Sequence, residues 1–332
     1  MHRSNVLSLW RLAAASLTTM IMVGCAPTVQ PVAGSEQPVA VVSDTPSPLT
    51  SPLTSPPPGP LTSPPPGPAV TPTPMSSPDR SPAPAATQPA VLAASEPPSW
   101  FRQRLLDVTA TGFPAPQDAP IEYLDRRLIT IDRLPRPTRD AFGWTATAIP
   151  DELVARSTWR EGCPTTLEEL RYVTATYWGF DGLHHTGELI MHADVVDTME
   201  QVFRVMHDGR FPLEQVALLE PMDFYEFHRR GDDNITAMYE CRASTGSSRW
   251  SQHAFGRAID INPFHNPYRK QTSEGLVILP AYATAYVDRA DVRPGMIIEN
   301  GPIVAAFDAA GWGWGGRWNT LKDWQHFSAA GS

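Results

Sequence analysis

The sequence lacks runs of basic residues and carries a surplus of acidic ones. It contains 26 Lys and Arg against 35 Asp and Glu, so its net charge is -9 over 332 residues. A protein that coats a phosphate backbone needs a concentrated positive surface. The composition therefore excludes nucleic acid as the expected partner.

A long hydrophobic run is also missing. The most apolar stretch, 12–23, has roughly a dozen residues, whereas a membrane-spanning helix needs about 20. It follows two arginines and precedes Cys25, which is the pattern of a secretory signal peptide, so we expect 1–24 to be an export signal. Its end, Met22-Val23-Gly24-Cys25, resembles a bacterial lipobox. This resemblance implies lipidation of Cys25 and an anchor in the outer face of the cell membrane; the alternative is an ordinary secreted protein with an incidental cysteine.

Cysteine is scarce, with three residues in the chain. Once Cys25 is assigned to lipid, Cys163 and Cys241 remain, in a compartment where disulfides persist. We expect these two to pair, and closing a loop of this size stabilises a fold by roughly 4 kcal/mol in the chain-entropy model. A role as metal thiolates would require further Cys or His at short spacing, which neither cysteine has.

Proline is abundant, with 36 residues that are concentrated in the first hundred positions. Residues 26–98 consist largely of Pro, Ser, Thr, Ala and Val, and include the octad PLTSPPPG twice, at 52–59 and 60–67. Such a composition cannot bury a core. We therefore predict that 25–98 is the lipidated cysteine followed by a disordered linker, which acts either as a spacer that reaches a distant substrate or as a simple solvated connection.

Apolar periodicity begins after this linker. We predict a flanking segment over 99–135, opening with a short amphipathic helix at 99–108, and then one domain over 136–332. In that domain, alternating apolar residues at 170–178 and 187–191, separated by Asp181-Gly182, predict a β-hairpin.

A helix should follow the hairpin, because apolar residues recur at spacings of three and four over 195–206. The mixture of strands and helices predicts the α+β class, and we expect a monomer.

Two histidines and one aspartate form the candidate metal site. Residues 257–262 alternate as a strand does, so Asp260 projects from a strand whose other face is apolar. His253 precedes this strand by a Gly-containing turn, and His326 lies in a second short segment with strand character. Two His and one Asp with an open fourth position suit a catalytic zinc ion, which acidifies its bound water and polarises a carbonyl.

Asp323 lies three residues before His326. We interpret it as the general base that takes a proton from the metal-bound water and passes it to the leaving amine. The chain shows no Ser-His-Asp nucleophile motif near these residues.

These residues carry a family resemblance. The pattern SxHxxGxAxD at 251–260, followed by DxxH at 323–326, resembles the zinc peptidases of bacterial cell walls, the D-alanyl-D-alanine carboxypeptidase and L-alanyl-D-glutamate peptidase family that includes vancomycin-resistance carboxypeptidases. The similarity covers roughly 136–332. It extends to three further motifs: Tyr239-Glu-Cys-Arg242, the nine residues from Asp260 to Tyr268, and Gly311-Trp-Gly-Trp-Gly-Gly316.

The resemblance implies a small antiparallel sheet with flanking helices and one zinc ion in a groove across it. It implies His253, Asp260 and His326 as ligands, Asp323 as base, and peptidoglycan stem peptides as substrates. It also implies that Arg242 grips a substrate carboxylate, which a guanidinium does through two parallel hydrogen bonds.

Two questions stay open at this point. Carboxypeptidase and dipeptidase members of this family typically carry Glu at the base position, whereas L-alanyl-D-glutamate endopeptidases resemble this chain in using Asp, so Asp323 favours an endopeptidase. The rival function is a zinc-bearing cell-wall binding or signalling module, as in the hedgehog signalling domain, and the acid at 323 favours the enzyme. Ser251 is interpreted as a hydrogen-bond partner of a ligand or of the substrate.

Four other groups are interpreted as structural. His184-His185 belong to the hairpin, because neighbours on a strand point to opposite faces and do not share an ion. We expect His265 to be a solvated loop residue without a role, and Asp232-Asp233 to form a solvated turn. We assign three tryptophans to the core rather than to a glycan groove: Trp312, Trp314 and Trp318.

Overall fold

The computed structural model describes residues 93–221, 228–245 and 247–331. All described residues belong to one compact unit, 82–332. The predicted signal peptide at 1–24, Cys25 and the linker up to residue 92 lie outside the described residues. Within the described ranges, no helix combines the length and apolar character needed to span a bilayer.

A three-stranded antiparallel sheet forms one side of the described unit. Its strands are β1 (Trp144–Thr147), β2 (Leu170–Trp178) and β3 (His184–His192), in the order β1-β2-β3. Strands β2 and β3 form the predicted hairpin, and Gly182 in the connecting turn has a φ of 72°, which glycine adopts without strain. The prediction of a hairpin from the alternating pattern is confirmed.

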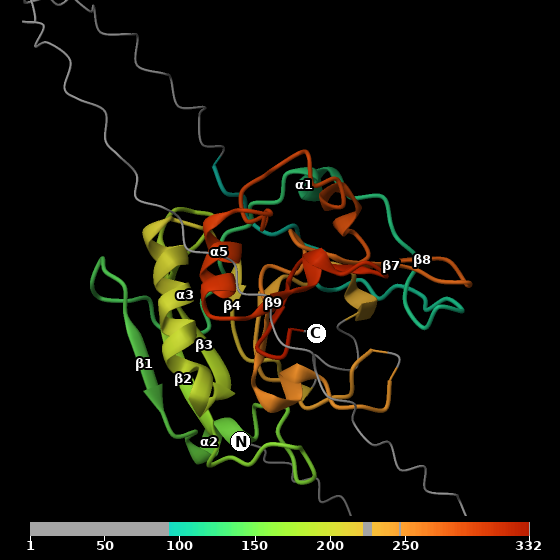
Figure 1. The fold of residues 1–332 in the computed structure, drawn as a ribbon. Helices are drawn as coiled ribbons and strands as arrows, with labels where there is room; N and C mark the ends of the chain where they lie inside the picture. The colour runs from blue at the N-terminus through green and yellow to red at the C-terminus, as the bar shows by residue number, and fades with distance from the viewer. Residues whose placement is uncertain (1–92, 222–227, 246, 332) are drawn as a thin grey trace, which may run out of the picture. The chain divides into compact units, whose positions relative to one another are not determined.

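Helix α3 (Val196–Asp208) follows β3 through the short η1 turn (Ala193–Val195) and packs beside this sheet (Figure 1). It corresponds to the helix predicted at 195–206. Its apolar stripe is buried, as the spacing of three and four predicts: Met199, Val202, Phe203 and Met206.

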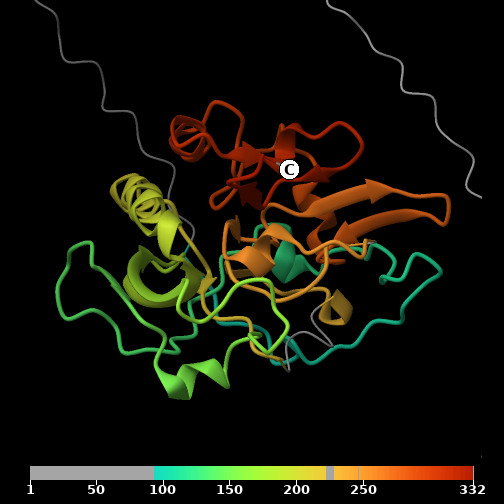
Figure 2. The ribbon, with the colours of Figure 1, turned by 60° about the horizontal axis from the view of Figure 1, so that its bottom comes forward.

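Two further antiparallel sheets carry the C-terminal half of the chain. In the first, β11 (His326–Ser328) lies between β6 (Ala258–Asp260) and β9 (Gly313–Trp314). In the second, β7 (Tyr268–Gln271) lies between β8 (Leu276–Leu279) and β10 (Lys322–Asp323). Figure 2 shows the β7–β8 hairpin beside the C-terminal segment.

The remaining elements are short: β4 (Gln215–Val216) and β5 (Ile235–Thr236), which pair in parallel, with α1 (Ile121–Leu124), α2 (Asp151–Val154), α5 (Pro302–Ala309), η2 (Gln252–Phe255), η3 (Ala283–Tyr286) and η4 (Gly315–Arg317). The structure thus has the predicted α+β class. It distributes its antiparallel strands over three small sheets instead of one.

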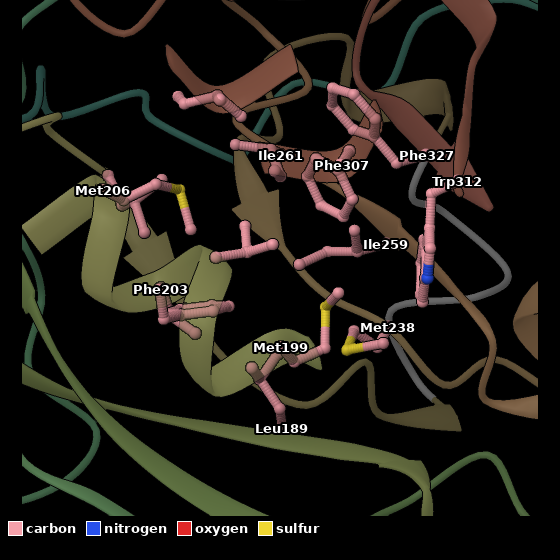
Figure 3. Close-up of a cluster of buried hydrophobic side chains, with 14 of the residues drawn as sticks. Leu189, Met199, Phe203, Met206, Met238, Ile259, Ile261, Phe307, Trp312 and Phe327 are labelled. Carbon is pink, nitrogen blue, oxygen red and sulfur yellow. The ribbon is translucent and has the colours of Figure 1, made fainter. Parts of the chain in front are cut away.

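The main core lies between α3 and the strands of the C-terminal half. Ile259 and Ile261 are fully buried there, so the apolar face predicted for the strand around Asp260 is confirmed. Figure 3 shows these two side chains in the space between α3 and the aromatic rings of Phe307 and Phe327. Burial of this face directs the alternate residue, Asp260, away from the core.

Cys163 and Cys241 form a disulfide, as predicted, with their Cα atoms 5.9 Å apart. The bond ties the segment before β2 to the residue that precedes Arg242. It thereby restrains the backbone at one of the predicted substrate-binding residues.

The predicted flanking segment, 99–135, packs against the rest of the described unit. Order begins before its predicted start, because Ser95, assigned to the linker, pairs with Leu128. The predicted helix at 99–108 is wrong: a turn occupies 99–103. Arg102 has a φ of 58°, outside the helical region, and its backbone N–H donates to Asp232 at 3.0 Å.

A buried arginine anchors this segment. Arg126 is fully buried and donates two hydrogen bonds to the Glu214 carboxylate, at 2.8 and 2.6 Å. Its guanidinium also lies 4.2 Å from the centre of the Phe264 ring. A bidentate pair of this kind is stable in the interior because each charge is compensated where water is excluded.

Two predictions about charged residues were wrong. Asp232 and Asp233 do not form a solvated turn: both are buried, Asp232 accepts a hydrogen bond from the Tyr123 hydroxyl, and Asp233 pairs with Arg102 at 2.7 Å. The short aspartate pair looked solvated because its partners are more than a hundred residues away in the sequence.

His265 is likewise buried, and not a solvated loop residue. Its Nε2 donates to the Arg126 carbonyl at 2.9 Å, while its Nδ1 accepts from the Asn234 amide at 3.0 Å. The His184-His185 pair belongs to β3, as predicted. His185 lies between Asp132 and Asp181, and His184 faces His207.

The buried His265 makes stability sensitive to acid. Burial lowers its pKa to about 3, against about 6.5 for an unperturbed imidazole. The unfolded chain therefore binds the proton first, so the stabilisation is complete above pH 6.5 and is lost as the pH falls towards 3. We expect this residue to lower the free energy of unfolding by up to about 1.4 kcal/mol per pH unit in that window.

Urea unfolding between pH 7 and pH 4 measures this slope. His265→Gln should be less stable than the wild type at pH 7 but should show a shallower fall with pH. Equal slopes in the two proteins would contradict the assignment of the acid sensitivity to His265.

Candidate metal centre

Three side chains from separate elements converge on one point. The Nε2 atom of His253 lies 3.1 Å from Nδ1 of His326 and 3.3 Å from Oδ1 of Asp260. The third distance, from His326 Nδ1 to Asp260 Oδ1, is 3.0 Å. His253 and His326 are buried, and Asp260 is partly exposed. Three lone-pair atoms therefore face a common centre that is open on one side.

Local backbone geometry places His253. It lies in η2, where the Ser251 hydroxyl caps the turn by accepting the His253 N–H at 3.3 Å. Gly256 ends the turn with a φ of 65°, and a Cβ there would lie 2.6 Å from the backbone nitrogen of His192. Only glycine fits this position. Ser251, predicted to bond a ligand or the substrate, thus bonds the backbone of a candidate ligand residue, His253.

The second ring nitrogen of His253 is also held. Its Nδ1 donates to the Met238 carbonyl at 2.6 Å, which leaves the Nε2 lone pair of the neutral ring aimed at the centre. Such a bond to the distal nitrogen is typical of histidines that bind metals, because it sets the tautomer and the orientation of the ring.

Strand pairing sets the positions of the other two candidate ligands. Strands β6 and β11 are antiparallel, with His326 directly opposite Asp260. Directly opposite residues project to the same face of a sheet. The register therefore brings a histidine and an aspartate together across 66 positions of sequence.

The donor set fits a divalent ion that prefers nitrogen and oxygen. Two ligands at about 2.0–2.1 Å from a tetrahedral zinc ion lie roughly 3.3 Å apart, and the observed separations are 3.0–3.3 Å. Burial acts to raise the pKa of Asp260, but the adjacent His253 and His326 rings outweigh it and hold this pKa well below its usual range. The group His253, Asp260 and His326 can therefore hold a metal ion.

Asp323 lines the same groove as the three candidate ligands and belongs to the β10-β7-β8 sheet. It is the last residue of β10 and pairs with Tyr268 of β7. Gly315 makes room for it, because a Cβ there would lie 2.5 Å from the Asp323 carbonyl oxygen. The short passage from β10 to β11 thus presents Asp323 and His326 to one site.

The Asp323 carboxyl group is electrostatically perturbed. Its Oδ1 atom is buried and has no hydrogen-bond partner among the residues the structure describes. Burial, with a contribution from the negative charge of Asp260, raises the pKa of Asp323 to about 7. A carboxyl group with a pKa near neutrality both accepts and returns a proton readily at physiological pH.

Arg242 lies in the same groove, next to the disulfide. Its Nε donates to Glu240 at 2.5 Å and its Nη1 to the Ala243 carbonyl at 3.2 Å. Burial acts to lower the pKa of Arg242, but Glu240, Asp260 and Asp323 raise it, so the guanidinium stays charged. Glu240 lies in a motif noted in the sequence, but its role as the partner of Arg242 was missed.

The groove has a volume of about 530 Å³, within the range of sites that enclose small ligands. All six predicted site residues line it: Arg242, Ser251, His253, Asp260, Asp323 and His326. Sequence reasoning missed further lining residues, among them Trp250, Tyr268, Lys270 and Leu321. Tyr268 is the last residue of the 260–268 motif, whereas Lys270 lies in no motif that would have marked it as a site residue.

The three tryptophans divide between core and groove. Trp312 and Trp314 are buried in the main core, as predicted. Trp318 was also assigned to the core, but it is half-buried and lines the groove, with its ring centre 5.5 Å from that of His326. It can therefore contact a bound ligand.

Comparison with known families agrees with this site. Residues 245–329 match the family model described as D-alanyl-D-alanine carboxypeptidase. Comparisons with curated proteins and with solved structures gave no match. The matched stretch contains the His-Asp-His group and Asp323. This match supports a relation to the M15 peptidase family over residues 245–329.

Proposed function

We propose that the protein is a zinc-dependent peptidase that hydrolyses peptidoglycan stem peptides, either as a D-alanyl-D-alanine carboxypeptidase or as an L-alanyl-D-glutamate endopeptidase. One observation carries the proposal: a His-Asp-His group lines the same groove as Asp323, a half-buried residue whose carboxyl group has a raised pKa. The family match over 245–329 supports a peptidase.

His253, Asp260 and His326 would hold the zinc ion. When bound, zinc acidifies a coordinated water and polarises the carbonyl of the peptide bond to be cut. The hydrogen bond from His253 Nδ1 to Met238 keeps the Nε2 lone pair available for the metal.

Asp323 acts as general base and then as general acid. It accepts a proton from the attacking water, and it returns this proton to the amine that leaves. Its burial and its position beside the ligand strand support this role, and they favour an enzyme over a binding module that lacks such a base.

Arg242 orients the substrate. Glu240 accepts from Nε and the Ala243 carbonyl accepts from Nη1, so Nη2 is the guanidinium nitrogen that is left for a carboxylate of the peptide. A charge-assisted hydrogen bond of this kind positions the peptide relative to the metal and the base.

We further propose that the protein acts outside the cell. The disulfide between Cys163 and Cys241 is typical of exported proteins. Export through residues 1–24, lipidation of Cys25 and the Pro-rich linker would place a monomeric enzyme at the outer face of the membrane, within reach of the cell wall.

Cleavage of defined stem peptides tests this function. The purified protein, loaded with zinc, is incubated with L-alanyl-γ-D-glutamyl-L-lysyl-D-alanyl-D-alanine, and the products are identified by mass spectrometry. We expect either loss of one terminal D-alanine or a cut after L-alanine, and no product once a chelator has removed the metal. An intact peptide in the presence of the zinc-loaded protein would contradict the proposal and favour a binding module.

A further inference from the structure

Lys270 is an unpaired cation in the groove. The sequence contains two lysines, and the other one, Lys322, donates to the Gly316 carbonyl at 3.0 Å. Lys270 is half-buried and lines the groove, yet it has no hydrogen-bond or ion-pair partner among the residues the structure describes. A half-buried ammonium without a partner has lost part of its hydration, so an anionic ligand is favoured there.

The position of Lys270 relative to the base follows from strand geometry. Tyr268 is directly opposite Asp323, and Lys270 lies two residues further along β7 on the same face. Two residues of a strand span about 7 Å. Arg269 between them does not line the groove, as the alternation of a strand requires. The Lys270 side chain therefore lies on the same wall of the groove as Asp323, about the length of two residues of an extended peptide away from it along β7.

Lys270 is better placed for recognition than the other cations of the groove. Arg242 is already paired with Glu240 through its Nε. Arg249 is exposed in the loop between Ser244 and Trp250. Lys270 lies on the central strand of the β10-β7-β8 sheet, and a paired strand positions a contact more closely than a loop does.

We propose that Lys270 binds a second carboxylate of the substrate. The inference rests on the proposed function and makes it more specific. A stem peptide carries a C-terminal carboxylate and, two residues before the terminal D-alanyl-D-alanine bond, the α-carboxylate of D-glutamate. Arg242 would bind the C-terminal carboxylate and Lys270 the α-carboxylate of D-glutamate. The groove would then favour a stem peptide whose D-glutamate α-carboxyl group is free over one in which this group is amidated.

Two pentapeptides that differ at this carboxylate test the proposal. Both have the sequence L-alanyl-γ-D-glutamyl-L-lysyl-D-alanyl-D-alanine, one with the D-glutamate α-carboxyl free and one with it amidated. Lys270→Met should lower kcat/KM for the acid peptide by roughly 10- to 100-fold, the loss typical of a hydrogen bond between charged groups. It should change kcat/KM for the amidated peptide less than about twofold, and Lys270→Arg should retain most of the preference for the acid.

The matched control is Arg269→Met, which removes the neighbouring cation on the other face of β7. It should leave the preference for the acid peptide unchanged. An equal fall with both peptides in Lys270→Met, or no preference for the acid in the wild type, would overturn the proposal.

A binding measurement separates this proposal from the proposed function. Zinc-loaded Asp323→Ala protein is titrated with the two peptides by calorimetry, with and without the additional Lys270→Met change. If the acid peptide binds more tightly than the amidated one and this difference depends on Lys270, the inference is supported. It is supported even if the wild type cleaves neither peptide, because failure of cleavage contradicts only the proposed peptidase function. Equal binding of the two peptides, or binding of neither, would overturn the role of Lys270.

Discussion

Asp323→Ala is expected to lower kcat/KM for stem peptides by about 10²- to 10⁴-fold while zinc stays bound. Positioned proton transfer contributes a factor of this size. Asp323 does not belong to the group His253, Asp260 and His326, so its substitution should leave this group intact. The more conservative Asp323→Asn should be nearly as inactive, because an amide fills the same space but does not accept the proton. The carboxyl group of the wild type does accept it, with a pKa that is raised to about 7 mainly by burial.

Steady-state cleavage and zinc content by elemental mass spectrometry measure the two parts of this result. The control is Asp308→Asn, which removes an exposed carboxylate that pairs with Arg317; neither residue lines the groove. The control should retain activity. Turnover by Asp323→Ala equal to that of the wild type would refute the role of this residue.

His326→Ala is expected to release the metal and with it all activity that depends on zinc. The substitution removes one of the three proposed ligands and leaves His253 and Asp260, which alone would make a weak site. Loss of a ligand exceeds the 10- to 100-fold effect on affinity that is typical when a residue supporting a ligand is removed. The protein should therefore contain well under one equivalent of zinc after dialysis.

The matched control is His192→Ala, because His192 is a partly exposed histidine that pairs with Asp194 outside the metal group. It should keep one equivalent of zinc. Thermal unfolding of both variants verifies that they are folded. A folded His326→Ala protein that retains one equivalent of zinc would show that the ligand set is wrong.

Local patterns predicted the elements that hold the site. The β2–β3 hairpin, helix α3 and the strand around Asp260 each follow from the spacing of apolar residues, because burial of one face imposes a period of two or 3.6. The metal group could be proposed because histidine and aspartate ligands occur at motif spacing. The pairing of Cys163 with Cys241 followed from the small number of cysteines.

Tertiary contacts explain what could not be predicted. Asp232, Asp233 and His265 are polar residues in a turn-like sequence, and nothing local shows that Tyr123, Arg102 and Arg126 cover them. The same contacts draw the backbone of Arg102 out of the predicted helix. Charges that pair across more than a hundred residues look solvated in the sequence, since a lone acidic residue is normally exposed.

The central place of β11 in its sheet has a consequence for the order of assembly. His326 lies beside the other two proposed ligands only when β11 is paired between β6 and β9. Before that step the chain offers an incoming ion only His253 and Asp260, seven positions apart. Binding of a metal by all three residues should therefore require this sheet to have formed, and time-resolved zinc uptake during refolding would report on its formation.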